Sequence, residues 1–525
     1  MSILEHLKFM WGFEIGAGVH YYKNSYWGVP DHSPTGSFYA LYDTQFYEAH
    51  QPPTNVGGGL RSMKQTSFYQ DPIPGDGAAA SLLAFQGTYC EITSPAITGS
   101  VLTPGDFHWT DGWVHFSFKH DFDFDMDQTE YGVPVAGDLG SWIHLCSFGS
   151  GSVNDRGHTS AIPFFSGSVL DASTGADIWM PLPIGYTDVA LEFRGKGYRP
   201  DSYISFYLVR QRVDAHPAGY GGPAPTPGDY VIAIVYRADI PGLATEVYSS
   251  TAPVDLNAGT WSQFAIRYEA HDTNGKIQVY QNGAQIMDEQ NIVTRDQNQP
   301  KDWNCVTFSS HGKYATQDAP SEGFPNNVWP EYSHLIDHLF LWDSAGNADG
   351  VQAYATSSLF IQGLAPDDDW SIENFRNSDG GATNLWDYVD DPGDPTPLEV
   401  SWCTASSVPP TSCSFTNIGP GAVNNGAHPW WKYLPGGTSP DAFGEFIGVN
   451  AVVACSQTGS VDYKGSSFMV DTQGASGLDF FGSSSIISQD QLLWSISPTD
   501  IHNPGTAWTT FEIQELKMGF KIEPE

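Results

Sequence analysis

A strict alternation of apolar and polar residues constrains the fold of this chain more than any other feature. It runs from Trp113 to Asp125, where the sequence reads WVHFSFKHDFDFD. The even positions hold the apolar residues Val114, Phe116, Phe118, Phe122 and Phe124. Successive side chains of a β-strand point to opposite faces, so this period of two predicts a strand with one face in a core and the other in water.

Shorter strand-like runs recur along the 525 residues, near positions 145, 191, 206, 234 and 307. The chain also contains 55 Gly and 36 Pro, and 14 % of it is aromatic. Gly and Pro form the tight turns between strands, and aromatic side chains fill pleated surfaces. The chain is therefore predicted to be all-β, and its length indicates more than one domain.

The composition of the sequence changes beyond residue 365. The runs Asp367-Asp368-Asp369-Trp370 and Asp390-Asp391-Pro392 are acidic and rich in turn-forming residues, and further strand-like segments follow them. We therefore expect three parts: an N-terminal arm or first-sheet edge over 1–55, a large β-sandwich over 56–365, and a second, smaller C-terminal β-sandwich module over 366–525.

The charge of the chain excludes several classes of partner. It has 22 basic and 60 acidic residues, a formal net charge of −38. A field of that sign repels phosphate backbones and anionic lipid head groups, so we expect no nucleic-acid partner. No stretch of about eighteen uninterrupted apolar residues occurs, so no membrane insertion is expected, and the N-terminus does not resemble a signal peptide.

A hairpin motif in the middle of the chain resembles the concanavalin A-like (laminin G-like) family. The motif runs WxxFxIRY from Trp261 and then GKIxVYxNG to Gly283, and it precedes a strand that ends in LFLWD at Asp343. The Asn-Gly pair supplies the positive φ angles that a tight hairpin turn requires. The resemblance implies a concanavalin A-like jelly-roll β-sandwich over roughly residues 60–350.

The end of the chain resembles the closing β module of tailed-bacteriophage virion proteins. It runs from Asn503-Pro504-Gly505 through Trp508 to Gly519-Phe520, and the opening Trp11-Gly12-Phe13-Glu14-Ile15-Gly16 resembles the start of phage appendage proteins. This resemblance implies a virion structural protein, either a head decoration or fibre or a tail appendage, that presents a lectin-like surface. It also implies assembly in the host cytoplasm, contacts with other virion proteins, and a homo-oligomer.

Two other functions stay open at this point. The chain is also consistent with an adhesin that binds a host-surface glycan, or with a polysaccharide-cleaving enzyme. The sequence lacks the GxSxG elbow of serine hydrolases and any nucleotide-binding glycine pattern. Our expectation is therefore that the protein is not an enzyme and has no catalytic residue.

Acidic residues along the chain are candidates both for catalysis and for calcium binding. Asp residues that alternate along a strand edge suit a carboxylate pair of a glycosidase, but the Glu-x-Asp-x-Glu pattern of concanavalin-like glycosidases is missing. Hard oxygen ligands from a turn suit Ca²⁺. No cofactor is expected, and calcium is the one candidate ion, at Asp121, Asp123, Asp125, Asp367, Asp368 and Asp369.

Tryptophan residues near predicted loops or strand ends are the best candidates for a binding surface. Indole rings stack on the C–H faces of sugars and are also enriched at subunit interfaces and in cores. The glycan-binding or interface candidates are Trp109, Trp113, Trp303, Trp329, Trp430 and Trp431. The alternative is that these rings cap the core.

Histidine and cysteine show no ligand spacing. His334 and His338 lie an even number of residues apart in a predicted strand, which would place them on one face, and we interpret the scattered histidines as structural. Cys403 and Cys413 could close a short loop by a disulfide or could stay as free buried thiols.

Overall fold

The computed structural model describes nearly half of the chain, with gaps between the described segments. These segments are 3–12, 25–27, 63–69, 85–93, 109–120, 142–150, 168–170, 177–179, 201–211, 228–236, 244–251, 254, 259–309, 312–313, 332–344, 346–361, 366–373, 375–377, 403–405, 411–417, 446–455, 463–471, 478–481, 485–486, 491–509, 512 and 516–524. Antiparallel strands dominate them, and the all-β prediction is confirmed. No helix in these segments has the length and hydropathy to cross a membrane.

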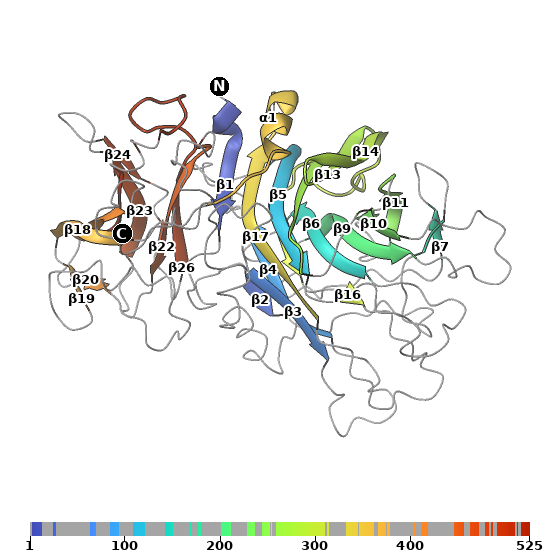
Figure 1. The fold of residues 1–525 in the computed structure, drawn as a ribbon, viewed down its shortest axis with the longest axis horizontal. Coiled ribbons are helices and arrows are strands. Elements are labelled where there is room, and N and C mark those ends of the chain that lie inside the picture. Colours follow the sequence, from blue (N-terminus) through green and yellow to red (C-terminus); the bar gives the residue numbers. More distant parts are fainter. Residues whose placement is uncertain are drawn as a thin grey trace, which may run out of the picture.

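The larger body is a β-sandwich of two sheets, whose strands form one continuous hydrogen-bonded path because β3 pairs with β4 (Figure 1). We call the first half of the path sheet A. In spatial order, its strands are β1 (Leu7–Trp11), which pairs with β17, then β3 (Met63–Tyr69), β17 (Tyr332–Asp343), β5 (Asp111–His120), β12 (Ser262–Glu269), β13 (Gly275–Gln281) and β14 (Ala284–Ile292).

We call the other half sheet B. Its strands in spatial order are β4 (Phe85–Thr93), β15 (Cys305–Ser309), β6 (Trp142–Ser150), β9 (Asp201–Gln211), β10 (Gly228–Tyr236) and β11 (Ala244–Ser249). Two short strands, β2 (Ser25–Trp27) and β16 (Gly312–Lys313), add to β4 and β6, and β7 (Ser168–Leu170) pairs with β8 (Asp177–Trp179) separately.

Aromatic side chains fill the space between the two sheets. The ring of Phe116 in sheet A lies 5.3 Å from that of Phe308 in sheet B, and Phe148 lies 5.1 Å from Tyr268. All four side chains are fully buried. Burying one such side chain contributes about 1.5–3 kcal/mol, so this aromatic layer is a main source of the stability of the sandwich.

The alternation that begins at Trp113 is confirmed for its apolar face only. Val114, Phe116 and Phe118 point into the core between the sheets. His115 and Ser117, on the face predicted to meet water, are also buried, at 1 % and 0 % exposure. This part of the prediction is wrong because a second layer covers the outer face of sheet A; residues 121–125 lie outside the described segments.

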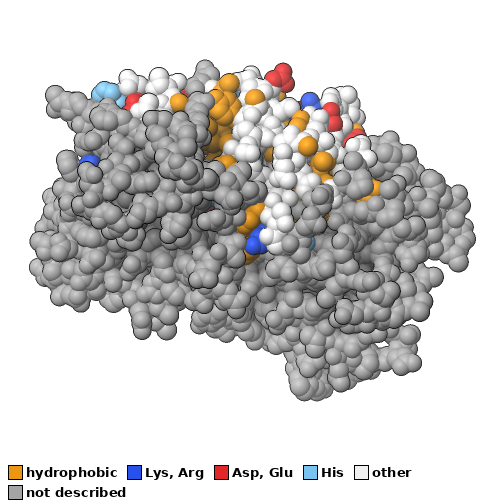
Figure 2. Space-filling view, viewed as in Figure 1, with side chains coloured by type: hydrophobic (Ala, Val, Ile, Leu, Met, Phe, Trp, Pro, Cys, Tyr) orange, Lys and Arg blue, Asp and Glu red, His pale blue; other side chains and the backbone are white. Residues whose placement is uncertain are grey.

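The second layer is the segment 346–361, which we call the strap. It begins with helix α1 (Ala348–Ala355) and continues as an extended chain to Ile361. An apolar cluster joins sheet A to the strap; it comprises Leu7, Met10, Trp113, Ala265, Tyr280, Phe340, Trp342, Val351, Ala355, Leu359 and Ile361. Figure 2 shows apolar side chains along the region of β1 and α1. Sheet A therefore has a packed layer on both faces.

A β-bulge in the central strand β17 changes which face its residues occupy. Asp337 pairs with Ser117 and Phe340 with His115, so His338 and Leu339 together oppose Phe116, and His338 has a φ of 49°. The extra residue reverses the alternation. His334 consequently contacts core residue Phe118, whereas His338 contacts the strap, and the prediction that the two histidines share a face is wrong.

Most of the C-terminal strands form a separate sheet. Its spatial order is β18 (Pro366–Glu373), β21 (Thr411–Asn417), β27 (Leu516–Pro524), β23 (Tyr463–Asp471) and β24 (Leu478–Phe481), with β25 (Ser485–Ile486) on β23. Two further strand pairs are β22 (Val449–Cys455) with β26 (Gln491–Ser497), and β19 (Phe375–Asn377) with β20 (Cys403–Ala405).

The N-terminal strand β1 connects this part of the chain to the sandwich. It follows the 3-10 turn η1 (Ile3–His6) and lies between β17 and the β22–β26 pair (Figure 1). The Asn450 side-chain amide donates a hydrogen bond to the Met10 carbonyl over 2.8 Å, and Ile496 joins the core cluster of the sandwich. Residues far apart in sequence therefore meet along one strand.

We predict that Gly112→Ala destabilises the sandwich by about 1–3 kcal/mol, the usual range for overpacking. An added Cβ would lie 2.7 Å from Trp109 and 2.9 Å from Trp303, and 2.8 Å from the Trp342 carbonyl oxygen. Urea unfolding followed by circular dichroism measures the change. Asn274→Ala in an exposed turn is the control, and equal stability of the two variants would contradict this packing.

Candidate functional site

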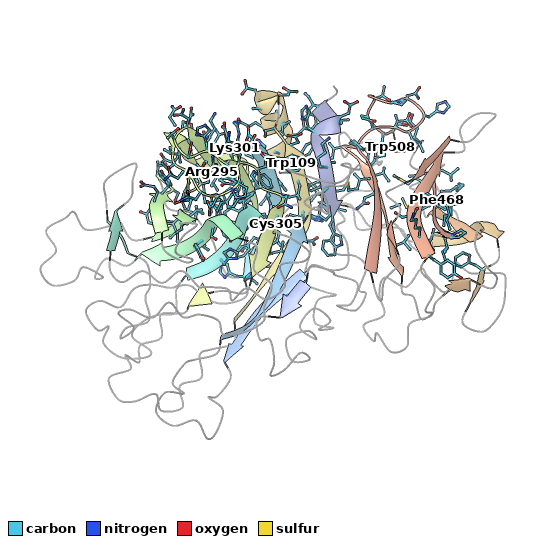
Figure 3. The ribbon with its side chains drawn as sticks, turned by 180° about the vertical axis from the view of Figure 1, so that it is seen from behind. Trp109, Arg295, Lys301, Cys305, Phe468 and Trp508 are labelled. Carbon is cyan, nitrogen blue, oxygen red and sulfur yellow. The ribbon has the colours of Figure 1, made fainter. Side chains whose placement is uncertain are left out.

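Three of the tryptophans predicted for a binding surface lie in the interior. Trp113 and Trp303 are fully buried, and Trp109 is 8 % exposed. The rings of Trp109 and Trp303 meet edge to face at 5.1 Å, and their backbones hydrogen bond to each other in both directions. Figure 3 shows Trp109 among the side chains of the sandwich. Their exposure was predicted wrongly, and the alternative, that they belong to the core, is what the structure shows.

The other candidates give no assembled site. Trp329, Trp430, Trp431 and the Asp121–Asp125 series lie outside the described segments. Asp367, Asp368 and Asp369 belong to strand β18, which pairs with β21, so the predicted acidic turn is a strand. Their side chains are not among those described. Within the described segments, no group of three or more His, Cys, Asp or Glu side chains could hold a metal ion.

The cysteines that can be placed are buried thiols. Cys146 and Cys305 lie in neighbouring strands of sheet B as buried thiols outside any disulfide, and Figure 3 shows Cys305 within the sandwich. Burial raises the pKa of the Cys146 thiol well above its ordinary value, so it is a poor nucleophile. The side chains of Cys403 and Cys413 lie outside the described set, so their pairing stays a prediction.

The outer face of sheet B holds a polar cluster that the sequence analysis did not single out. It consists of His144 and Ser147 from β6 and Ser205 and Tyr207 from β9, and we call it the His144 cluster. A spacing of three normally sends two strand residues to opposite faces. A register shift between His144 and Cys146 inserts one residue, so that His144 pairs with Tyr207 and Ser147 with Ser205. The bulge therefore places all four side chains on one face.

Hydrogen bonds join three members of the His144 cluster in a chain. Nε2 of His144 lies 2.6 Å from Oγ of Ser147, which in turn lies 2.5 Å from Oγ of Ser205. Each hydroxyl has one hydrogen and can both donate and accept. The chain can therefore run in either direction, and each direction fixes one neutral tautomer of His144.

Tyr207 completes the cluster beside the imidazole. The two ring centroids are 5.2 Å apart and the planes are inclined by 60°. The four side chains are only 3–4 % exposed, and charges and dipoles act more strongly in such a site than in bulk water. An imidazole and a phenol side by side can serve as a proton acceptor and a proton donor for one bound molecule.

The alternation in the segment around residue 206 contained a usable signal for this site. Ile204, Phe206 and Leu208 face the core, which leaves Ser205 and Tyr207 on the other face. A strand with apolar residues on one side and a serine and a tyrosine on the other indicates a polar outer face. The bulge that adds His144 has no signal in the sequence, because Leu145 and Cys146 are both apolar.

No protein-family model matches this chain, and no curated protein matches it. Solved structures do match, among them an endo-β-1,4-glucuronan lyase from the fungus Trichoderma reesei, at 12 % identity and a TM-score of 0.28, over 57 % of this chain and 89 % of that one. The alginate lyase Aly36B matches at 12 % identity and a TM-score of 0.29, over 55 % and 82 %. Basic winged bean lectin matches at 14 % identity and a TM-score of 0.21, over 51 % and 78 %.

These neighbours share a lectin-like β-sandwich, and scores this low assign no substrate. The comparison nevertheless overturns one expectation. A concanavalin-like sandwich without a serine elbow was predicted not to be an enzyme, and that prediction is wrong, because polysaccharide lyases are among the matching structures. The absence of hydrolase motifs is therefore not a reason to exclude catalysis on this fold.

We predict that Ser205→Ala shifts His144 toward the tautomer protonated at Nδ1. In the other tautomer Nε2–H donates to Ser147, whose own hydrogen would then lose its acceptor, at a cost of about 1–3 kcal/mol. Nitrogen-15 NMR of histidine-labelled protein reports the tautomer, and His144→Gln assigns the signal. Ser117→Ala removes a buried serine from sheet A as the control; an unchanged His144 spectrum in Ser205→Ala would contradict the hydrogen-bonded chain.

Proposed function

We propose that this protein binds a carbohydrate polymer at the outer face of sheet B and cleaves it by elimination. The imidazole of His144 beside the phenol of Tyr207, with Ser147 and Ser205 behind it, is the observation that supports the proposal. Sugars offer hydroxyl groups and apolar C–H faces, and this cluster presents hydroxyls, an imidazole and an aromatic ring. The lyases and the lectin among the similar structures agree with the proposal, which does not rest on them.

The reaction transfers two protons and needs no nucleophile. One member of the pair removes the proton on the ring carbon next to a carboxyl group of the sugar. The electron pair left behind forms a carbon–carbon double bond while the adjacent carbon–oxygen glycosidic bond breaks. The leaving oxygen takes a proton from the other member of the pair. The products are a reducing end and an unsaturated sugar.

Elimination suits the described groups better than hydrolysis does. Glycosidases use two carboxyl groups about 5–9.5 Å apart, whereas the interactions found for the His144 cluster join an imidazole, a phenol and two hydroxyls. A carboxyl group on the substrate is required to acidify the carbon-bound proton. The substrate class is therefore a polymer that contains uronic acid residues.

The protein's net charge of −38 opposes the binding of a negatively charged polymer, so binding depends on the salt concentration. Repulsion between the protein and a polyanion weakens binding at low salt, and screening shortens its range to about 8 Å at physiological ionic strength. Activity assays therefore belong at physiological ionic strength or above.

We predict that Tyr207→Phe and His144→Gln each lower the rate of polymer cleavage by about 10²–10⁴-fold, the usual contribution of one acid or base group. Polyuronate and neutral polysaccharides are incubated with the protein, and both ultraviolet absorbance of unsaturated products and new reducing ends are measured. The wild-type protein should yield both signals together from polyuronate.

Two controls match these variants. Tyr248→Phe removes the hydroxyl of another buried tyrosine of sheet B, which donates to the Val293 carbonyl, and His271→Gln changes an exposed histidine. Both should retain activity. The appearance of reducing ends without unsaturated products would contradict elimination and indicate hydrolysis. Glycan binding without either product signal would contradict cleavage and indicate a lectin-like adhesin.

We also propose that the protein is a component of a bacteriophage particle and assembles there as a homo-oligomer with other virion proteins. The sequence resemblance of residues 503–520 supports this location. In that region a loop is held by Asp500, whose carboxylate accepts hydrogen bonds from the backbone of His502 and Asn503, and Trp508 donates to the Ser497 carbonyl. Figure 3 shows Trp508 on the C-terminal strands.

Immunogold labelling of gradient-purified particles tests the location. We expect gold on the particle surface and a fixed number of copies per particle. Protein found only in the soluble fraction would contradict the proposal, and would leave the cleavage proposal unaffected.

A further inference from the structure

Side-chain hydrogen bonds attach the strap to the outer face of sheet A, and the described segments show four of them. Gln352 donates to the Tyr280 hydroxyl over 2.7 Å, and Gln263 donates to the Leu359 carbonyl over 2.9 Å. The other two involve buried imidazoles: Nδ1 of His115 lies 2.8 Å from the Ala355 carbonyl, and Nδ1 of His338 lies 3.2 Å from the Ile361 amide nitrogen. Two histidines therefore contact the strap backbone directly.

These two contacts fix opposite tautomers. A carbonyl oxygen only accepts, so Nδ1 of His115 holds the hydrogen and its Nε2 is bare. The Ile361 amide only donates, so Nδ1 of His338 is bare and its Nε2 holds the hydrogen. Within the described segments neither Nε2 atom has a hydrogen-bond partner, and both imidazoles are buried. Each ring therefore hydrogen bonds to the closed strap in its neutral form.

We propose that the strap is an acid-sensitive latch, closed over sheet A when His115 and His338 are neutral and released when they are protonated. This device is independent of the chemistry proposed for the His144 cluster, because it lies on the other sheet.

Burial is the main cause of this sensitivity. It lowers the pKa of His115 to about 4, against a smaller opposing effect of its hydrogen bond to Ala355. Burial, with a smaller contribution from the nearby His115, lowers the pKa of His338 to about 3. An opened strap exposes both rings to water, where their pKa returns to about 6.5.

The charged groups around the pair oppose part of this effect. Asp337 of β17 is fully buried, and its Oδ1 lies 3.5 Å from Nδ1 of His338. A proton on this Nδ1 repels the Ile361 amide and favours release, whereas an ionised Asp337 stabilises the protonated ring in the closed state and opposes it. On the other strands and the strap, Arg267 of β12 pairs with Asp111 of β5 at 2.7 Å, and Asp349 of α1 acts on Arg267. Tyr280 of β13 is neutral in this range, because burial raises its pKa.

The sign and size of the effect follow from linkage. Both pKa values are lower in the closed state than in the open one, so opening takes up protons and becomes more favourable as the pH falls below about 6.5. Between about pH 6 and pH 4.5, each histidine raises the opening constant by up to about tenfold per pH unit. The two together make the dependence up to about 100-fold per unit.

Release would uncover an aromatic surface. The strap covers Trp113, Tyr280, Phe340 and Trp342 on sheet A. A contiguous apolar patch of this kind binds hydrophobic dyes and other apolar partners. Dye binding therefore gives a second measure of opening.

Hydrogen exchange of the full-length protein tests the proposal, with peptides from the strap compared at several pH values and corrected for the intrinsic exchange rate. We expect the logarithm of the opening constant to fall with pH at a slope near two for wild type, near one for His115→Asn or His338→Asn, and near zero for the double variant. Asparagine suits these sites because it tolerates the φ of 49° at position 338 and can donate or accept as each ring nitrogen does.

His334→Asn is the matched control. It removes a third buried histidine, which lies in β17 like His338, has its pKa lowered to about 3, and contacts Phe118 rather than the strap. In this variant, the logarithm of the opening constant of the strap should still change with pH at a slope near two. An unchanged slope in the double variant would overturn the proposal. If the variants fail to fold, the wild-type protein alone decides the question. As the pH is lowered, exchange of strap peptides at a higher pH than exchange of β12 peptides supports the latch. Exchange of both sets of peptides at the same pH overturns it.

Discussion

Burial of sheet A on both faces is the constraint on which the rest of the structure depends. One face meets sheet B through rings such as Phe116 and Phe308, and the other meets the strap through Trp113 and Trp342. A sheet enclosed in this way has no free face for a ligand. We therefore place the candidate chemistry on sheet B, at the His144 cluster, whose four side chains are 3–4 % exposed.

Two β-bulges decide where the polar chemistry lies. The bulge in β6 turns His144 to the same face as Ser147, Ser205 and Tyr207. The bulge in β17 turns His338 out of the core and against the strap. Bulges re-aim single side chains without changing the rest of the sheet, and they are frequent near functional sites. Two of the three histidines that we assign a role, His144 and His338, are placed by such an irregularity.

Much of the fold could be predicted from the sequence, because its signals are local. The core face of the alternation over Val114–Phe118 and the Asn282-Gly283 turn depend on side-chain period and backbone φ, and both are confirmed. Burial of His115 could not be predicted, since the strap that covers it lies more than 200 residues away in the chain. The same holds for Trp109 and Trp303, which pack against each other across a long sequence separation.

The complete candidate site could not be predicted from the sequence for a related reason. Its four residues come from two strands, and one of the strands contains an extra residue that no local pattern marks. The prediction that the chain is not an enzyme failed because it relied on the absence of motifs for nucleophilic and phosphate chemistry. A pair of proton-transfer groups on a sheet face has no compact motif.

The most direct test of the central claim is a crystal structure of Tyr207→Phe with a bound uronate oligosaccharide. The account predicts a sugar over β6 and β9, with the ring carbon beside its carboxyl group about 3–3.5 Å from His144 or from the position of the lost hydroxyl. A sugar bound on the C-terminal strands, or none at saturating concentration, would contradict it.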